Sequence, residues 1–308
     1  MVPFLGRGKS DNAHAQAHAT HATSEVYLTP GEFKIQEYAP TQADSAENVA
    51  ALRTFLAEYR AAHPPPSDYA PFENAWAAED DLYCRYMRAA KGDMRNAKKR
   101  IVETLSWRRE FHPDIIPPDE VRGEALTGKH ILSGFDRNGR PILYLRPGRE
   151  NTKSSPVQIR YLVWSLERAI DLMPPGQRSM TIVVDFHGAG LSTMPSLGTA
   201  RHVANILQNH YVERLGRAFV CHTPRFISAF FTALSPFLDP ITKDKIRFNE
   251  PHMTEFIAPD QLDMEFAGGT FAYKFDFDVY WDSLVRRCGI LPDGRRQSTV
   301  DAIARGEL

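Results

Sequence analysis

The segment from Phe237 to Lys245 reads Phe-Leu-Asp-Pro-Ile-Thr-Lys-Asp-Lys and places a hydroxyl group near an ammonium group. Asp239 before Pro240 predicts a helix start, because aspartate is a favoured N-cap residue and proline suits the first helical position. In that register Thr242 and Lys245 lie three residues apart on one face. The pair suits a phosphate-bearing ligand, although a plain helix start followed by a solvated lysine would explain the same residues.

A strongly apolar stretch precedes this polar segment. Residues 224–237 predict a helix with large apolar side chains, and these are Phe226, Phe230, Phe231, Leu234 and Phe237. The sequence therefore joins an apolar helix directly to a small polar site.

Composition limits the possible classes of function. With 308 residues, 43% hydrophobic and 11% aromatic, the chain can bury a large core and still line a cavity. The 37 basic and 38 acidic residues provide no cationic field for nucleic acid, so any membrane contact should be local and reversible. No apolar run approaches the roughly 20 residues of a membrane span. Three scattered cysteines, Cys84, Cys221 and Cys288, indicate reduced thiols in a cytosolic compartment.

Common catalytic and metal motifs are missing from the sequence, including Gly-x-Ser-x-Gly, the phosphate-binding loop, Cys-x-x-Cys and His-Glu-x-x-His. The fragment from Gly188 to Thr193 begins like a dinucleotide fingerprint, but Thr193 replaces the third glycine and Pro195 delays the helix. Asp185 and His187 lack a partner nucleophile, so core or loop roles are favoured. A haem site remains an alternative, with the candidate ligands His187, His202, His210 and Tyr211.

The pattern divides the chain into four parts. Residues 1–43 predict a disordered tail, residues 44–112 an all-helical module, residues 113–290 an α/β domain and residues 291–308 a C-terminal tail. Within the first part, three histidines have spacings that a metal could use, but without acidic or cysteine partners a flexible tail is favoured: His14, His18 and His21.

The expected elements fix the fold class. The module should contain helices at 44–62, 79–90 and 93–111. The α/β domain should contain strands at 129–135, 140–145, 181–184, 217–221 and 245–248, and helices at 157–173, 197–211, 224–237 and 278–288. Alternating strands and helices predict an α/β fold with a mainly parallel sheet, flanked by helices that leave an apolar cavity.

Five motifs in a fixed order resemble the CRAL-TRIO family, and within it the fungal phosphatidylinositol transfer proteins. They are Arg85–Lys91, the hairpin Asp136–Pro141, the strand ending Val-Val-Asp185, His210–Gly216 and Phe237–Pro240. The resemblance covers roughly residues 75–285, and its C-terminal part is most similar to the branch that binds phosphatidylinositol together with a sterol-like ligand. It implies that residues 113–290 form a CRAL-TRIO lipid-binding domain.

The resemblance also implies a phosphatidylinositol headgroup site. Its residues here would be Glu213, Thr242, Lys245, Asp136, Pro141 and Lys91, with Glu213 accepting hydrogen bonds from inositol hydroxyls and Lys245 acting as a point charge on the phosphate. One position departs from the family pattern, because Ala90 stands where an arginine is usual. Headgroup affinity should be weaker unless another base, such as Arg88, compensates.

A second departure concerns the choline site of related proteins. Four polar positions of phosphatidylcholine-binding members are apolar here: Leu132, Leu143, Met180 and Ile182. A choline phosphate would lose its hydroxyl partners there, and an unpaired buried polar group costs roughly 1–3 kcal/mol. The resemblance therefore implies that phosphatidylcholine is excluded and a sterol or other apolar ligand favoured. Without it, the four residues would be read as ordinary core.

The expected function is exchange of phosphatidylinositol for a second hydrophobic lipid between membranes, without enzymatic chemistry and with no cofactor besides bound lipid. The apolar helix at 224–237 would act as a gate that opens on the membrane. The alternative is a module that tethers membranes or presents lipid to a partner such as a phosphoinositide kinase. The sequence further predicts a monomer in the cytoplasm that associates transiently with endoplasmic reticulum, lipid droplet or plasma membrane.

Overall fold

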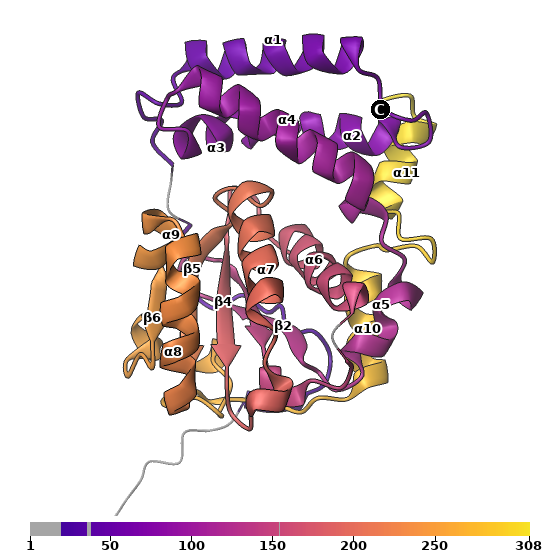
Figure 1. Ribbon diagram of the computed structural model, residues 1–308. Coiled ribbons are helices and arrows are strands. Elements are labelled where there is room, and N and C mark those ends of the chain that lie inside the picture. The colour runs from indigo at the N-terminus through magenta and orange to yellow at the C-terminus, as the bar shows by residue number, and fades with distance from the viewer. Residues whose placement is uncertain (1–19, 36–37, 154) are drawn as a thin grey trace, which may run out of the picture.

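The computed structural model describes residues 20–35, 38–153 and 155–308. Figure 1 shows a layer of helices lying across one end of an α/β domain. The observed class is therefore the predicted one, a mainly parallel sheet flanked by helices with a helical N-terminal module.

Four helices form the N-terminal module: α1 Ala46–Ala62, α2 Ala70–Ala77, α3 Leu82–Ala89 and α4 Met94–Phe111. The starts of α1 and α4 follow from capping, because the side chains of Ser45 and Asp93 accept backbone N–H groups of the first turn. Helix α2 was not predicted from the sequence. It lies directly after the proline-rich 64–66 segment and is only eight residues long.

The α/β domain contains one five-stranded sheet in the order β2-β3-β4-β5-β6. Its strands are β2 His130–Phe135, β3 Pro141–Leu145, β4 Met180–Asp185, β5 Leu215–Cys221 and β6 Ile246–Phe248. The first two form the predicted antiparallel hairpin, and β3 to β6 run parallel. The apolar sequence of β4 is explained by its central place in the sheet.

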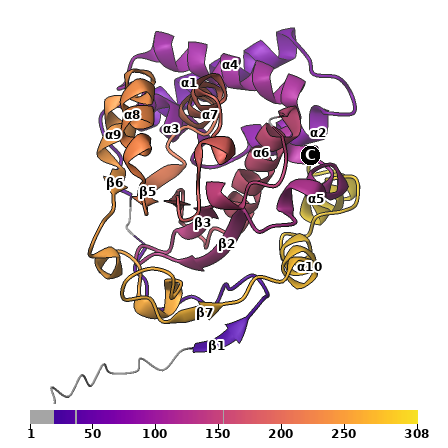
Figure 2. The same cartoon turned by 60° about the horizontal axis from the view of Figure 1, so that its bottom comes forward.

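Three helices cover one face of this sheet, α6 Pro156–Asp171, α7 Leu197–Asn209 and α8 Arg225–Leu234 (Figure 2). Shorter elements complete the domain: α5 Pro118–Ala125, α9 Pro240–Asp244, α10 Phe277–Arg287 and α11 Gln297–Ala304. Single 3₁₀ turns lie at Pro113–Ile115, Pro147–Arg149, Leu191–Thr193, Ser235–Phe237, Met253–Glu255 and Pro259–Gln261. Of the helices within the described ranges, none is long and apolar enough to cross a membrane.

The prediction of a disordered tail at residues 1–43 is wrong for its described part, residues 20–35 and 38–43. Strand β1, Thr20–Thr23, pairs in parallel with β7, Phe271–Tyr273, at the edge seen in Figure 2. Val26 is only 1% exposed, and the backbone N–H of Lys34 donates to Arg137. This segment is ordered by contacts with distant residues, so it has no helical or strand period of its own. Residues 1–19, with His14 and His18, and the side chain of His21 lie outside the description.

The predicted C-terminal tail at residues 291–308 is also corrected, because it contains α11. Arg296, which precedes that helix, donates to Glu167 at 2.7 Å and to Asp171 at 2.6 Å. Helix α11 in turn contacts α2 of the N-terminal module. The C-terminal segment thus ties the sheet domain to the helical module.

Candidate functional site

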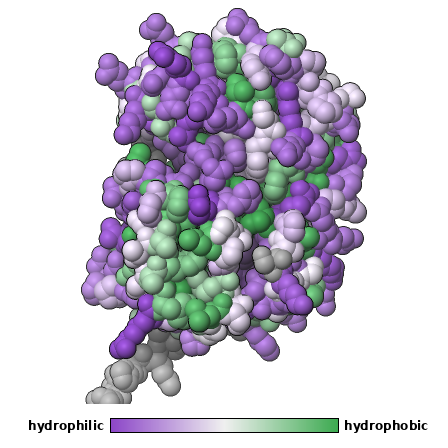
Figure 3. Space-filling model, viewed as in Figure 1, coloured by the Kyte–Doolittle hydropathy of each residue, from purple (hydrophilic) through white to green (hydrophobic). Residues whose placement is uncertain are grey.

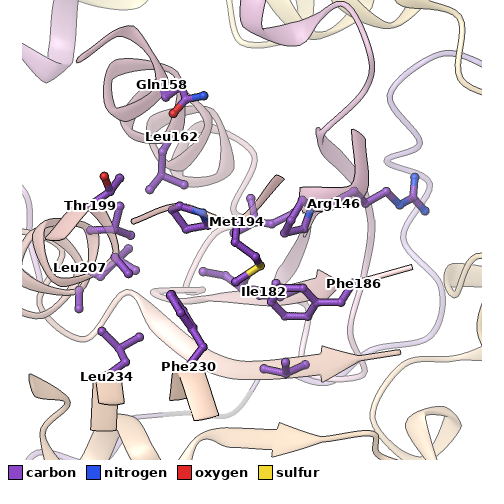
Figure 4. Close-up of a pocket in the computed structure, with 18 of the residues that line it drawn as sticks. Arg146, Gln158, Leu162, Ile182, Phe186, Met194, Thr199, Leu207, Phe230 and Leu234 are labelled. Atoms are coloured by element: carbon purple, nitrogen blue, oxygen red, sulfur yellow. The ribbon is translucent and has the colours of Figure 1, made fainter. Parts of the chain in front are cut away.

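An apolar cavity of about 610 Å³ lies between the sheet and helices α6, α7 and α8 (Figure 4). The strands contribute residues of alternating position, such as Ile182 and Val184 of β4, because side chains two apart point to the same face. Helix α7 contributes Val203 and Leu207, which face the sheet. The cavity volume is within the usual range of about 300–1,000 Å³ for small-molecule sites.

Helix α8, the predicted gate, supplies part of the cavity wall. Phe230, Phe231 and Leu234 line the cavity, whereas Phe226 and Phe237 do not. Phe237 is 40% exposed and lies beneath the guanidinium of Arg201, 3.9 Å from the ring centroid.

The surface over α8 is apolar, as Figure 3 shows. Beside it, Phe237, Ile241 and Phe248 are between 40% and 53% exposed. An exposed apolar surface of this kind is typical of interaction sites. Helix α8 therefore lines the cavity on one side and carries an apolar surface on the other.

Of the four positions expected to replace a choline site, only Ile182 lines the cavity. Leu132, Leu143 and Met180 are 2%, 0% and 1% exposed and belong to the main hydrophobic core. In the sheet, Leu132, Leu143, Ile182 and Ala218 are successive partners across four strands. Helix α6 packs on β2 and β3, so it covers the first two positions and leaves the other two open to the cavity.

Thr242 and Lys245 flank one end of the cavity, and Asp239 caps α9 as predicted, accepting the backbone N–H of Thr242 at 2.8 Å. Thr242 lines the cavity, and its hydroxyl donates to Asp239 at 2.6 Å. The ammonium of Lys245 donates to the carbonyl of Leu215 at 2.6 Å. Burial lowers the pKa of Lys245, and this exceeds the opposite effect of nearby Glu213. Thr242 must give up this bond to donate its hydroxyl to a ligand, whereas the ammonium of Lys245 has three N–H donors and can bind a ligand while it keeps its own.

A second, polar pocket of about 450 Å³ contains Glu213. Its other charged lining residues are Arg88, Arg140 and Arg178, and Tyr38 from the N-terminal segment completes the wall. Three guanidinium groups around one carboxylate make this pocket suited to an anionic group that also carries hydroxyls.

Glu213 is held by the helical module. Arg88 of α3 donates to its carboxylate at 2.7 Å and pairs with Asp44 at 3.0 Å. Burial alone would raise the pKa of Asp44, but hydrogen bonds from Thr41, Tyr38 and Arg88 lower it to about 2. Glu213 has a φ of 58°, an uncommon backbone conformation for a residue other than glycine. Such conformations cluster at functional sites.

The remaining predicted headgroup residues, Asp136, Pro141 and Lys91, do not line this pocket. Asp136 is 3% exposed, and its carboxylate accepts the backbone N–H groups of Asn138 and Arg140 at 2.9 Å each, so it shapes the hairpin turn. Pro141 follows in β3. Lys91 is exposed at the end of α3 and lines neither pocket.

Sequence reasoning missed Tyr38, Arg140 and Arg178. The ring of Tyr38 lies between two guanidinium groups, 4.1 Å from that of Arg88 and 4.8 Å from that of Arg178. Arg140 was within the quoted hairpin motif, and its approach depends on Gly216, where any Cβ would collide with the guanidinium. Arg140 belongs to the hairpin motif and Gly216 to the motif at 210–216. The sheet brings them together across β3, β4 and β5, and neither motif alone predicts that contact.

The candidate haem ligands do not converge. His210 stacks on Trp107 with an interplanar angle of 3°, and burial lowers its pKa to about 4. The hydroxyl of Tyr211 donates to Glu167 at 2.7 Å, and His187 packs edge-on against His222. His187, His202, His210 and Tyr211 line neither pocket. Among the residues that the structure describes, no group of three or more His, Cys, Asp or Glu side chains could hold a metal ion.

Comparison with known proteins identifies the family of this domain. Residues 126–268 match the family described as the CRAL/TRIO domain. A Schizosaccharomyces pombe protein described as CRAL-TRIO domain-containing is 46% identical over 238 residues, which cover 76% of this chain and 23% of that protein. Phosphatidylinositol transfer protein PDR17 of Saccharomyces cerevisiae is 37% identical over 235 residues, covering 72% of this chain and 65% of that protein.

The chain therefore spans less than two thirds of the length of either of these relatives. Among solved structures, the crystal structure of Sfh5 superposes with a TM-score of 0.61, covering 87% of this chain and 98% of that one. At 17% sequence identity this likeness concerns the fold alone.

Proposed function

This chain carries a CRAL/TRIO domain, and we propose that it binds phosphatidylinositol and exchanges it for a second hydrophobic lipid at membranes. The observation that carries the proposal is that an apolar cavity and a polar pocket lie next to each other. Thr242 lines the first, Glu213 lines the second, and Lys245 lies between them, close enough for the Glu213 charge to raise its pKa.

Each part suits one part of a phospholipid. A two-chain lipid carries on the order of 30 methylenes, which at ~0.8 kcal/mol each amount to about 25 kcal/mol of transfer free energy. A carrier must cover this surface during passage through water, and the cavity beneath α8 offers an apolar cover. The inositol ring would place hydroxyl donors at Glu213, while Arg140, Arg178 and Lys245 supply cationic donors for the phosphate.

Arg88 has a particular part in this arrangement. The family pattern has arginine where this chain has Ala90, and Arg88, two residues earlier on α3, lines the polar pocket. Its pairing with Glu213 and Asp44 raises its pKa despite burial, so it stays charged. We infer that Arg88 compensates for Ala90 by orienting Glu213.

Transfer of labelled phosphatidylinositol between vesicles tests the proposal. Glu213→Gln removes the carboxylate charge at constant size and should reduce transfer about tenfold, since a hydrogen bond to a charged group contributes about 1.5–3 kcal/mol. Glu58→Gln, at an exposed position of α1, is the matched control and should transfer like the wild type. Binding of a fluorescent fatty acyl probe should be equal in all three proteins.

The outcomes separate the candidate roles. Unchanged transfer by Glu213→Gln would reject the polar pocket as the headgroup site. Tight binding of phosphatidylinositol by the wild type without delivery to acceptor vesicles would instead favour the presenting or tethering role. The absence of both binding and transfer would reject the proposal as a whole.

A further inference from the structure

Helix α8 is the wall of the cavity that buries the fewest side chains. Helix α6 buries nine side chains and α7 buries three, whereas α8 buries only Ile227 and Leu234. Phe230 and Leu234 point from α8 into the cavity (Figure 4). The bonds at its two ends therefore decide whether this helix stays in place.

The start of α8 is tied to the sheet. His222, just before the helix, is hydrogen-bonded through Nδ1 to the carboxylate of Asp185 at 2.8 Å. The backbone N–H of Thr223 donates to the side chain of Asn249 at 3.2 Å, and the Asn249 amide donates to the Thr223 hydroxyl at 2.6 Å. Asp185 ends β4 and Asn249 follows β6, so two parts of the sheet fix this end. The start of α8 is thus the end about which the helix can turn.

The far end of α8 is held by one side chain of α7, that of Gln208. Its Nε2 donates to the backbone carbonyl of Phe237 at 2.9 Å, and its Oε1 accepts the backbone N–H of Asp239 at 2.6 Å. Both halves of the amide are used on two backbone groups, one on each side of Leu238. Over the described ranges, no other hydrogen bond joins residues 225–244 to α7.

Apolar contacts add to this junction between α7 and α8. Leu234 packs with Ala200 and Ala204 of α7 in a small buried cluster. The acyl region of a membrane is as apolar as such a cluster, so these contacts can be exchanged for lipid at little cost. The directional hold on the end of α8 therefore comes from Gln208.

Gln208 is also connected to the other parts of the site. It lines the cavity, and its backbone carbonyl accepts a hydrogen bond from Arg100 of the helical module at 2.9 Å. Asp239, whose backbone N–H it accepts, caps α9 and accepts both the backbone N–H and the hydroxyl of Thr242. The same amide therefore fixes the end of α8 and the short helix that presents Thr242.

We propose that Gln208 is the latch of the gate, a positioning residue whose amide holds the end of α8 against α7 until the protein meets a membrane. The inference rests on the proposed function, because it assigns the step that limits lipid exchange. The latch stabilises the closed state whether or not the cavity holds lipid. Its loss should therefore speed the entry and the exit of lipid equally and leave the affinity unchanged, whereas loss of a ligand-binding residue lowers the affinity.

The test uses the full chain, phosphatidylinositol that carries a pyrene acyl chain, and phosphatidylcholine vesicles as donor and acceptor. Gln208→Met keeps the length of the side chain but removes both hydrogen bonds, and it should raise the rate of transfer in each direction about tenfold. The distribution of the probe between protein and vesicles at equilibrium should stay the same. Gln297→Met, the same substitution at an exposed position of α11, is the matched control and should behave like the wild type.

Amide hydrogen exchange of the ligand-free proteins gives a second measurement that does not depend on lipid. Gln208→Met should exchange about tenfold faster at residues 225–239, while the strands of the sheet keep their protection. Faster exchange spread equally over the domain would overturn the inference, because it would report a loss of stability and not the release of one helix end.

The transfer data can overturn the inference independently. Unchanged transfer rates in Gln208→Met, or a lowered affinity in place of faster transfer, would show that the amide does not hold a gate. A wild type that transfers no phosphatidylinositol would reject the proposed function. The latch would then be supported by a local rise in hydrogen exchange at residues 225–239 and overturned by its absence.

Discussion

Filling the cavity should abolish lipid binding while leaving the fold intact, and Ala218→Phe is the sharpest way to do so. Ala218 lies on β5 in the cavity wall, between Ile182 and Ile246 in register. A phenyl group there adds about six carbon atoms to the cavity and displaces about as many ligand methylenes. At ~0.8 kcal/mol each, affinity should fall by about 5 kcal/mol, more than about a thousandfold.

The same substitution should have a small effect on the ligand-free protein. Burial of the ring contributes about 2 kcal/mol to the free energy of unfolding, and any strain from overpacking costs about 1–3 kcal/mol. We therefore expect urea titration to report a near-native free energy of unfolding. Fluorescence titration with labelled phosphatidylinositol should report loss of binding.

The matched control is Ala304→Phe, at an exposed position near the end of α11. It should bind lipid like the wild type. Undiminished lipid binding by a folded Ala218→Phe protein would show that the acyl chains do not enter this cavity, and the reasoning that joins it to Glu213 would fail.

Three further outcomes are expected. The free energy of unfolding should fall by at most about 3 kcal/mol as the pH is lowered from 6.5 to 4, because burial holds the pKa of His210 at about 4 whereas the unfolded chain takes up the proton near pH 6.5. Urea titrations at several pH values should show that the free energy of unfolding depends less on pH in His210→Gln. Arg296→Gln should cost about 3 kcal/mol in the same assay, because it leaves the buried Glu167 short of its 2.7 Å partner, whereas Arg295→Gln at a less buried ion pair should cost under about 1 kcal/mol. Ile241→Asp should reduce co-sedimentation with vesicles without changing lipid affinity in solution, because it places a charge on the exposed apolar surface; equal co-sedimentation would reject that surface as the membrane contact.

Local signals predicted much of the fold. The cap at Asp239, the start of the helix at residue 93 and the hairpin at Asp136–Pro141 each depend on signals within a few residues, and each was found where it was expected. The apolar run of β4 and the helical periods around it predicted the parallel sheet, because a strand that is buried on both faces is apolar at every position. Helix α2 escaped detection, although α3 is equally short, because it follows the prolines at 64–66 and carries Pro71 in its first turn, which the sequence presents as a break.

The site was predicted only in part, for reasons of depth and distance. Leu132 and Leu143 lie on the face of the sheet that lines the cavity, but α6 covers them. The alternation of a strand sequence shows which residues share a face, but not which helix packs on that face. Glu213 was found through its motif, whereas its partner Arg88 lies 125 residues earlier in the chain. Tyr38 was assigned to a disordered tail, because its contacts with Arg88 and Arg178 are made with residues far away in the sequence.

The pairing of β1 with β7 has a consequence for the order of folding. Thr20 pairs with Phe271, so about 250 residues separate two neighbouring strands. During synthesis, which proceeds at about 5–20 residues per second, β1 must wait many seconds without its partner while the five-stranded sheet has already been made. The N-terminal segment that brings Tyr38 to the polar pocket should therefore dock last and detach first. Amide hydrogen exchange should find β1 among the least protected strands, and the pocket would open each time this segment detaches.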